Sequence, residues 1–183
     1  MNRTNYLITG SASGIGAAIA MKLAKPNVQL FLHTKQNKTG LEQVAEQCRL
    51  SGAQVDCCFG DLAEVTTINK LVEKLNEHCK SLSGLICNAG FPDWRNFEEL
   101  DGSGLATSYR VIVDATFQLL THCTHLLSAN SKQKGKVVAV SSFLAHKFKV
   151  GNSIVPASAM AKSALEAMIK SYASQYAPQQ INA

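Results

Sequence analysis

Three glycines and two serines follow the first apolar run of the sequence, in the stretch TGSASGIG. A glycine-rich backbone can turn tightly and come close to a ligand, and the free N–H groups of a following helix attract anions. Gly10 suits the tight turn, Gly14 the approach to a pyrophosphate and Gly16 the packing of helix on strand. The alternative is an ordinary strand-to-helix turn capped by Ser11 or Ser13. Its position between a strand and a helix favours phosphate binding.

The fourth apolar run ends in a second group of small and polar residues. Asn88, Ala89 and Gly90 follow the run GLIC, and small residues at the carboxyl end of a strand leave room for a ribose. The Asn88 carboxamide both donates and accepts hydrogen bonds. We therefore expect Asn88 to tie this strand end to a neighbouring strand.

The second apolar run ends in LHTKQNK, with no acidic residue before Glu42. A carboxylate at this place holds the ribose 2′-hydroxyl of NAD, whereas a basic residue accommodates the 2′-phosphate of NADP. Thr34 can hydrogen-bond that phosphate, and Lys35 or Lys38 can neutralise it. The sequence therefore favours NADP, with NAD as the other possibility. A solvated loop that is basic by chance is the alternative interpretation.

These groups need strands and helices in a fixed order to come together. Short apolar runs alternate with longer segments of helical period, which is typical of βαβ units around a parallel sheet. The sequence predicts strands at 5–9, 28–33, 53–59, 84–88 and 136–141, and helices at about 14–25, 40–51, 64–80, 103–130 and 157–177. The expected fold is α/β: a Rossmann-like, doubly wound parallel sheet with helices on both faces and a ligand crevice at the carboxyl ends of the strands.

Two of the predicted helices carry local signals, and the end of the chain carries another. Thr39 and Glu42 have capping-box spacing, which predicts the start of the second helix there. The final residues QINA are expected to begin a sixth strand. The fourth helix has an apolar stripe that should pack on the sheet or on a partner subunit, made of Leu105, Tyr109, Ile112, Thr116, Leu119, Cys123 and Leu126.

The composition fits a single domain over residues 1–183. The chain is 46% hydrophobic and has no low-complexity segment, so it can bury a substantial core. The net charge of +5 is spread singly along the chain. This pattern disfavours nucleic acid as a partner and suits an anionic cofactor or substrate. No apolar run approaches the roughly 20 residues that a membrane span needs, so no membrane partner is expected.

The six cysteines form no CxxC pair and have no histidine at metal-binding spacing. Such a pattern predicts reduced thiols in a cytoplasmic protein and no bound metal. The cysteines are Cys48, Cys57, Cys58, Cys79, Cys87 and Cys123.

The stretch TGSASGIG reads in full as the TGxxxGIG loop of the short-chain dehydrogenase/reductase family, which the chain resembles over nearly its whole length. By this resemblance, the stretch Asp61-Leu62 after the third strand matches the family's adenine-contacting aspartate, and Asn88, Ala89 and Gly90 match its NAG motif. The resemblance implies a nicotinamide dinucleotide bound by the glycine-rich loop, at Gly10, Ser11, Ser13, Gly14, Ile15 and Gly16. Ser13 is a departure, because many NADP-preferring relatives carry Arg or Lys there.

The resemblance also implies a catalytic set of Asn, Ser, Tyr and Lys, in that chain order. Ser and Tyr hold the substrate oxygen, Tyr passes its proton, and Lys lowers the Tyr pKa and binds the ribose. Ser142, in AVSSFLAH, matches the serine, and Lys162 matches the lysine. The alternatives are a strand-end hydroxyl that caps a loop and a solvated helix lysine.

Two of the four catalytic positions depart from the family pattern. Ser158 stands four residues before Lys162, in the place of the tyrosine. An aliphatic hydroxyl is a far weaker acid than a phenol, and losing a positioned acid costs roughly 10² to 10⁴ in rate. Asp114 stands where the asparagine is expected. An ionised carboxylate cannot donate a hydrogen bond, and it would compete for Lys162 if the two approached.

No other residue in the sequence replaces the missing tyrosine. Val155 occupies the position seven before Lys162, where another branch of the family carries its tyrosine. Histidine is the side chain type suited to proton transfer near neutral pH, but His146 is interpreted as a surface-loop histidine. The family fold also continues past the length of this sequence, which ends at Ala183, so its last strands are expected to be missing.

Three hypotheses follow from this pattern. The favoured one is an oxidoreductase that transfers a hydride between NADPH and a small-molecule carbonyl or alcohol, with a weakened proton donor. The second is a non-catalytic dinucleotide-binding or interaction protein. The third is a fragment or altered form of an ordinary reductase. The resemblance further implies a homodimer or homotetramer, paired through the fourth and fifth predicted helices.

Overall fold

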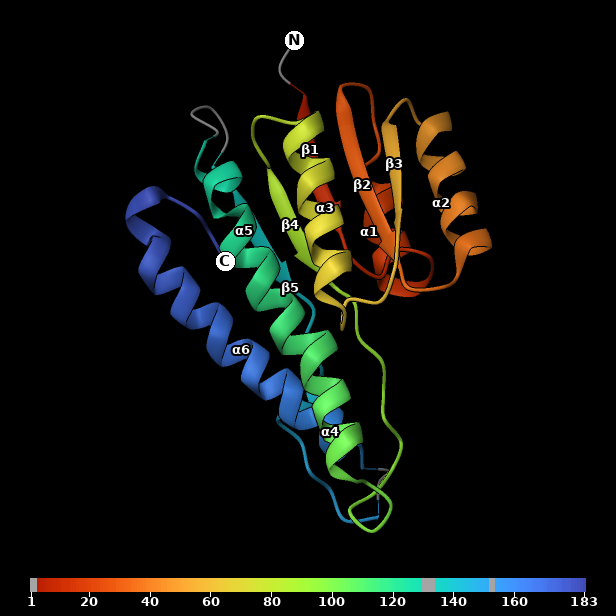
Figure 1. Cartoon of the computed structure of the whole chain (residues 1–183), viewed down its shortest axis with the longest axis vertical. Helices are drawn as coiled ribbons and strands as arrows, with labels where there is room; N and C mark the ends of the chain where they lie inside the picture. The colour runs from red at the N-terminus through yellow and green to blue at the C-terminus, as the bar shows by residue number, and fades with distance from the viewer. Residues whose placement is uncertain (1–2, 130–133, 152–153) are drawn as a thin grey trace.

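The computed structural model describes residues 3–129, 134–151 and 154–183, and its sheet has five parallel strands in the order β3-β2-β1-β4-β5 (Figure 1). The strands are β1 (Thr4–Ile8), β2 (Val28–Thr34), β3 (Gln54–Phe59), β4 (Gly84–Cys87) and β5 (Lys136–Ala139). The helices are α1 (Gly14–Leu23), α2 (Lys38–Leu50), α3 (Val65–His78), α4 (Gly102–Tyr109), α5 (Ala115–Ser128) and α6 (Pro156–Tyr176). The predicted Rossmann-like sheet is confirmed.

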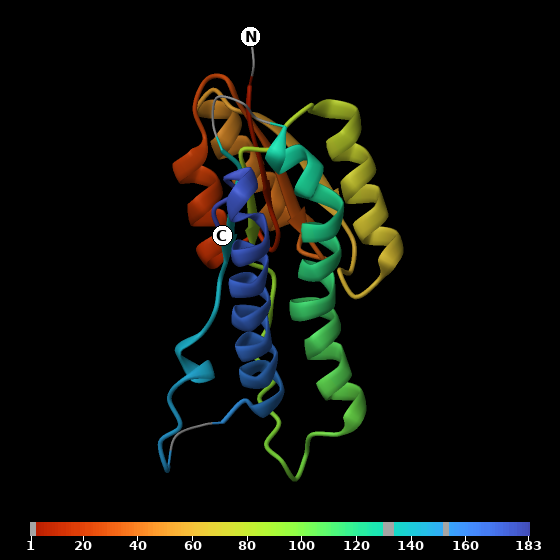
Figure 2. The same ribbon diagram turned by 90° about the vertical axis from the view of Figure 1, so that its left-hand side faces the viewer.

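Helices cover both faces of the sheet (Figure 2). Alternate strand residues point to opposite faces, so Ile8 and Leu32 pack with α1 and α2, whereas Leu7 and Phe31 pack with α3, α5 and α6. All seven residues of β2 are buried, as expected for a central strand of a parallel sheet. The two buried layers hold the carboxyl ends of β1, β2 and β4 in one rigid edge.

The start of α2 differs from the predicted capping box. Asn37 is the N-cap, because its side-chain oxygen accepts a hydrogen bond from the Gly40 N–H at 3.0 Å, and Thr39 lies inside the helix. A Cβ at Gly40 would lie 2.8 Å from the Ala12 carbonyl oxygen. The Asn37 cap and this small residue let α2 begin directly against the glycine-rich loop.

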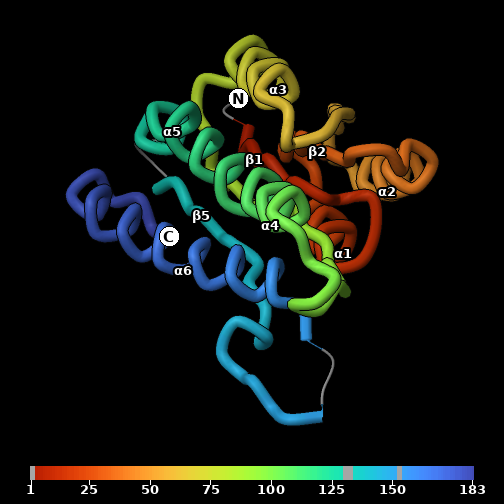
Figure 3. The backbone as a smooth tube through the Cα atoms, turned by 60° about the horizontal axis from the view of Figure 1, so that its bottom comes forward, coloured from red at the N-terminus to blue at the C-terminus, as the bar shows by residue number. Residues whose placement is uncertain are grey.

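A five-residue π-helical segment, Arg110–Asp114, separates α4 from α5 within the single helix that the sequence predicts. The predicted stripe is buried from Ile112 to Leu126 and half-buried at Leu105 and Tyr109. A π-turn adds a residue to the helical turn, so the faces of α4 and α5 differ in direction. Accordingly, α4 packs against α6, whereas α5 packs against α3 (Figure 3).

The last residues of the chain lie beside β5. Asn182 forms one parallel bridge with Lys136, and its carbonyl oxygen accepts a hydrogen bond from the Val137 N–H at 2.7 Å. The expected sixth strand is thus represented by a single bridge. Within the described residues, no helix combines the length and apolar character required to cross a membrane.

Candidate functional site

The glycine-rich loop turns on two residues with left-handed backbone, Gly10 at φ +65° and Gly14 at φ +55°. A Cβ at Gly10 would lie 2.9 Å from the Ala89 Cα, and one at Gly16 would lie 2.3 Å from the Gly10 carbonyl oxygen. At Gly14, nothing lies within 4 Å of such a Cβ. Gly10 and Gly16 are therefore required by close packing, whereas Gly14 leaves its backbone open to an incoming group.

Neither serine of the loop caps α1. The Ser11 hydroxyl donates to the His33 carbonyl oxygen at 3.2 Å and accepts from the His33 N–H at 3.0 Å. Ser13 is the N-cap residue but makes no side-chain cap hydrogen bond. The alternative of an ordinary serine-capped turn is therefore wrong. The first amides of α1 remain available to an anion, at the positive end of the helix dipole.

Asn88 joins the carboxyl ends of β1 and β4. Its Nδ2 donates to the carbonyl oxygens of Thr9 and Gly10 at 3.0 and 2.9 Å. The N–H groups of Asn88 and Ala89 donate to the Thr9 hydroxyl at 3.0 and 3.1 Å. The prediction that Asn88 ties neighbouring strand ends is confirmed.

A cavity of about 530 Å³ opens at the ends of β1, β2 and β3. This volume lies in the usual range of small-molecule sites. Four of the lining residues are those predicted to face the adenosine half of a dinucleotide: Thr34, Lys35, Asp61 and Leu62.

An ion pair crosses one side of this cavity. Lys35 Nζ lies 2.5 Å from Asp61 Oδ2. Burial opposes the charge of Asp61, but hydrogen bonds from Lys35 and from the Ala63 N–H outweigh burial and hold its pKa below the ordinary value. The cavity therefore presents both a cation and an ionised carboxylate to a ligand at neutral pH.

A second cavity, of about 350 Å³, shares Gly10, Ser13 and Asn88 with the first. The structure brings together here four residues that are far apart in the sequence: Gly90, Ser142, Ser158 and Lys162. Among the described residues that line it, none is a tyrosine. The two cavities follow the carboxyl edge of the sheet on either side of the glycine-rich loop.

Lys162 is buried at the inner end of the second cavity, with 9% of its surface exposed. Its Nζ donates to the Val140 carbonyl oxygen at 2.5 Å. Burial lowers the pKa of Lys162, with a smaller opposing effect from Cys87. A Cβ on Gly90 would lie 3.3 Å from Nζ, so the small NAG glycine makes room for the lysine. The alternative of a solvated helix lysine is wrong.

Ser142 follows β5 and begins a short 3₁₀ turn over Phe143–Ala145. Its hydroxyl oxygen accepts a hydrogen bond from the Leu144 N–H at 3.2 Å. Ser142 also lines the cavity of Lys162. The hydroxyl thus caps the turn, as the alternative interpretation expects, and its hydrogen remains available at the cavity.

Ser158 is committed to the segment after β4. Its hydroxyl accepts from the Asp93 N–H at 2.8 Å and donates to the Phe91 carbonyl oxygen at 3.1 Å. The residue is buried, with 7% exposed. Its single hydroxyl hydrogen therefore points to the protein backbone in this structure.

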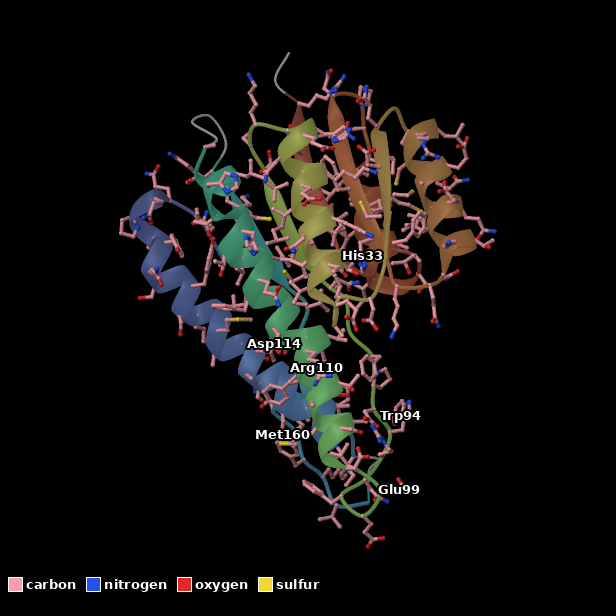
Figure 4. The ribbon with its side chains drawn as sticks, in the orientation of Figure 1. His33, Trp94, Glu99, Arg110, Asp114 and Met160 are labelled. Atoms are coloured by element: carbon pink, nitrogen blue, oxygen red, sulfur yellow. The ribbon has the colours of Figure 1, made fainter. Side chains whose placement is uncertain are left out.

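The Asp114 side chain lies outside both cavities. It is exposed on the π-helical segment, where Figure 4 labels it, and it is absent from the linings of both cavities. The inward stripe of this segment runs through Ile112, whose Cγ1 lies 3.6 Å from the position of a Cβ on Gly90, beside Lys162. The Asp114 side chain is two residues off this inward stripe, and its catalytic role stays a prediction. An aliphatic side chain stands at the corresponding inward place.

A polar cluster beside the site has no counterpart in the sequence prediction. His146 Nε2 lies 2.8 Å from Glu166 Oε1, and the Ser141 hydroxyl donates to the same oxygen. His146 is exposed and lines neither cavity, which supports its interpretation as a surface histidine. The signal that could have found Glu166 is its position one helical turn after Lys162. No cluster of metal-ligating side chains occurs among the described residues.

Fold and site define the class of α/β proteins with a nucleotide-binding Rossmann fold, and the comparison with known families narrows it. The family model described as short chain dehydrogenase matches residues 4–183. The chain therefore belongs to the short-chain dehydrogenase/reductase family.

Individual relatives are similar at moderate identity. The chain is 36% identical over 138 residues to 11-beta-hydroxysteroid dehydrogenase-like 2 of Arabidopsis thaliana. The alignment covers 74% of this chain and 44% of that protein. It superposes with a TM-score of 0.85 and 27% identity on a 3-oxoacyl (acyl-carrier-protein) reductase from Agrobacterium tumefaciens C58 with NADP bound, covering 98% of this chain and 67% of the other. It superposes with a TM-score of 0.87 and 21% identity on an NADH-dependent reductase, A1-R′, complexed with NAD, covering 98% and 76%. The chain thus spans less than half the length of the Arabidopsis relative.

Proposed function

We propose that this chain binds a nicotinamide dinucleotide, NADPH by preference, and transfers a hydride between it and a small-molecule carbonyl or alcohol with a weakened proton donor. The observation that carries the proposal is the pair of cavities that meet at Gly10, Ser13 and Asn88. The first cavity has room for the adenosine half of the ligand, and the second contains the buried Lys162. The N-terminus of α1, which has no side-chain cap, lies between them.

The residues present fit a dinucleotide along this edge. Asp61 and Leu62 would face the adenine, and the open backbone at Gly14 with the first amides of α1 would receive the pyrophosphate. Lys162 would hold the nicotinamide ribose at the far end. Gly90 supports this placement of Lys162. A Cβ at Gly90 would lie 3.3 Å from Lys162 Nζ, so the glycine leaves room for the ammonium group.

The preference for NADPH rests on Lys35. Its side chain lies at the end of β2, is 59% exposed and reaches Asp61. The ammonium group can therefore move to a 2′-phosphate and stay in contact with solvent. NADP-bound and NAD-bound structures both occur among the similar proteins. Their presence supports a nicotinamide dinucleotide, and the choice between the two is our inference from Lys35 and Thr34.

The chemistry of the site depends on what its own residues can do. A bound nicotinamide supplies or accepts the hydride. Ser142 can donate its hydroxyl hydrogen to a substrate oxygen, and Lys162 supplies positive charge beside it. Ser158 does not supply the proton, because its hydrogen is donated to the Phe91 carbonyl oxygen. Proton transfer must then come from water, which makes slow turnover the expected behaviour.

A non-catalytic dinucleotide-binding protein is the second candidate. One observation favours it: both hydrogen-bonding capacities of Ser158 are used to hold the segment after β4. The residue at the tyrosine position thus has a structural role. Ile112, beside Lys162, cannot replace a polar catalytic group.

We also propose a homodimer or homotetramer formed through α5 and α6, in a reducing compartment such as the cytoplasm. Phe117 on α5 is 59% exposed, and a hollow between these helices includes Phe117 and Met168, which supports pairing on this face. All six cysteines are free thiols, which supports the compartment.

The test begins with titration of NADPH and NADH, followed by intrinsic fluorescence. Oxidation of the bound reduced nucleotide is then followed with a panel of ketones for wild type and Ser158→Tyr. Binding with slow turnover in the wild type is the expected result. Binding without any turnover in the wild type and activity in Ser158→Tyr would favour the non-catalytic alternative. Failure to bind either nucleotide would reject the site assignment.

A further inference from the structure

A third cavity, of about 520 Å³, opens beside the site of Lys162. It shares Leu144, Val155 and Ala159 with the second cavity, so the two cavities adjoin at these three residues. It lies between α6, α4 and the segment after β5. A molecule that reaches Ser142 and Lys162 can therefore extend directly into it.

The lining of this third cavity is strongly apolar. Its large side chains include Phe97, Tyr109, Phe148, Ile154, Pro156 and Met160. The Ser163 hydroxyl also lines it but donates to the Ala145 and Ala159 carbonyl oxygens. Most of the wall therefore offers a ligand no hydrogen bond and favours hydrocarbon.

The charged residues of the lining have one sign. Lys147 and Lys149 contribute to it, and no acidic residue does. Within the described chain, the ion pairs of the structure do not include either lysine. Arg95, in the segment between β4 and α4, forms ion pairs with Asp93 and Asp101. Two ammonium groups at an apolar cavity attract an anion.

The exposure of this lining also indicates an occupant. Phe97 is 74% exposed, Phe148 is 77% exposed, and Met160 on α6 is 38% exposed. Contiguous apolar surface of this kind usually marks a binding site. Figure 4 places Met160 near the lower end of the molecule, where α4 and α6 approach each other.

We infer that the third cavity binds the non-reacting part of the substrate, and that this substrate has an apolar body with an anionic group at its far end. The inference rests on the proposed function, because the reacting carbon must lie at Ser142 and Lys162. The apolar body would displace water from the aromatic lining, and Lys147 and Lys149 would meet the anion.

Binding can be tested without turnover. The fluorescent apolar anion 1-anilinonaphthalene-8-sulfonate is bound to the full chain and then displaced by decanoate, by decanol or by decyltrimethylammonium. Decanoate should displace it at a concentration roughly tenfold lower than decanol, as expected for about 1.4 kcal/mol of added interaction. Decyltrimethylammonium should be the weakest competitor. Equal potency of the three ligands would overturn the inference.

Variants locate the site and separate this inference from the proposed function. The double variant Lys147→Gln/Lys149→Gln should make decanoate and decanol equally potent. Met160→Glu should weaken the binding of decanoate more than that of the other two competitors. Lys70→Gln on α3 is the matched control and should change nothing. Unchanged decanoate binding in both site variants would overturn the inference. NADPH titration of every variant should give the wild-type affinity; if the wild type binds decanoate but not NADPH, the proposed function fails and the apolar anion site stands.

Discussion

The hydroxyl of Ser158 on α6 accepts a hydrogen bond at 2.8 Å from the backbone N–H of Asp93, a residue 65 positions earlier in the chain. The same hydroxyl donates to the Phe91 carbonyl oxygen. The residue in the tyrosine place therefore fastens the segment after β4 over the cavity of Lys162. A tyrosine there would need space that this segment now occupies, so Ser158→Tyr must move the segment before it can act.

Ser158→Ala should lower the free energy of unfolding by about 1–3 kcal/mol, because it leaves the buried Asp93 N–H without its partner. Ser158→Thr keeps the hydroxyl and should retain most of the stability. Ser171→Ala, on the same helix but at the surface, is the control. Urea unfolding monitored by circular dichroism measures the three variants. A loss no larger in Ser158→Ala than in Ser171→Ala would show that the two hydrogen bonds contribute little.

Lys162→Met should weaken NADPH binding roughly 10-fold to 100-fold, the usual range for a lost charged hydrogen bond. The fold should survive, because burial already penalises the charged lysine and methionine can fill the same space. Lys170→Met, two turns further along α6, is the matched control. Fluorescence titration compares the dissociation constants, and thermal melting verifies folding. Wild-type affinity in Lys162→Met would remove this residue from the nucleotide site.

Lys35→Ala should reduce the ratio of NADPH to NADH affinity by roughly tenfold, because one charged contact to the 2′-phosphate is lost at an exposed position. NADH affinity should change little, since a 2′-hydroxyl carries no charge. Lys70→Ala controls for the change of net charge. Parallel titrations at low and physiological salt measure the ratio of NADPH to NADH affinity for each variant. The preference for NADPH needs another explanation if the ratio stays at its wild-type value.

Glu166 should make stability depend on pH in the acidic range. Hydrogen bonds from Ser141 and then from His146 hold its pKa below the ordinary value of 4.5. A carboxyl whose pKa is lowered by folding stabilises the folded state above its unfolded pKa, and this contribution is lost as the pH falls through the folded pKa. Melting temperatures of wild type and Glu166→Gln should therefore differ at neutral pH and converge below pH 4.5. Glu73→Gln, on the exposed face of α3, should show no such convergence.

Sequence patterns were sufficient for the sheet and for the residues that serve the backbone. The glycines at 10 and 16 and the carboxamide of Asn88 have roles fixed by local geometry, and the structure contains those contacts. The orientation of the Asp114 side chain could not be predicted in this way. A match to a family motif does not locate a π-helical segment, and the inward position belongs to Ile112.

The partners of individual hydroxyl groups could not be predicted either. Ser158 contacts Phe91 and Asp93, and Ser141 contacts Glu166, through approaches between segments that are distant in the chain. Neither spacing nor residue type encodes such approaches. They depend on where the loops after β4 and β5 settle against α6.

The four hydrogen bonds around Asn88 have a consequence for motion. They bind the turn after β1 and the turn after β4 to each other through Thr9 and Gly10. One turn cannot open while the other stays closed, because each holds the polar groups of its neighbour. The amide hydrogens of Asn88 and Ala89 should then exchange with solvent at a common rate, as a single cooperative unit. A ligand that contacts either turn would slow exchange in both.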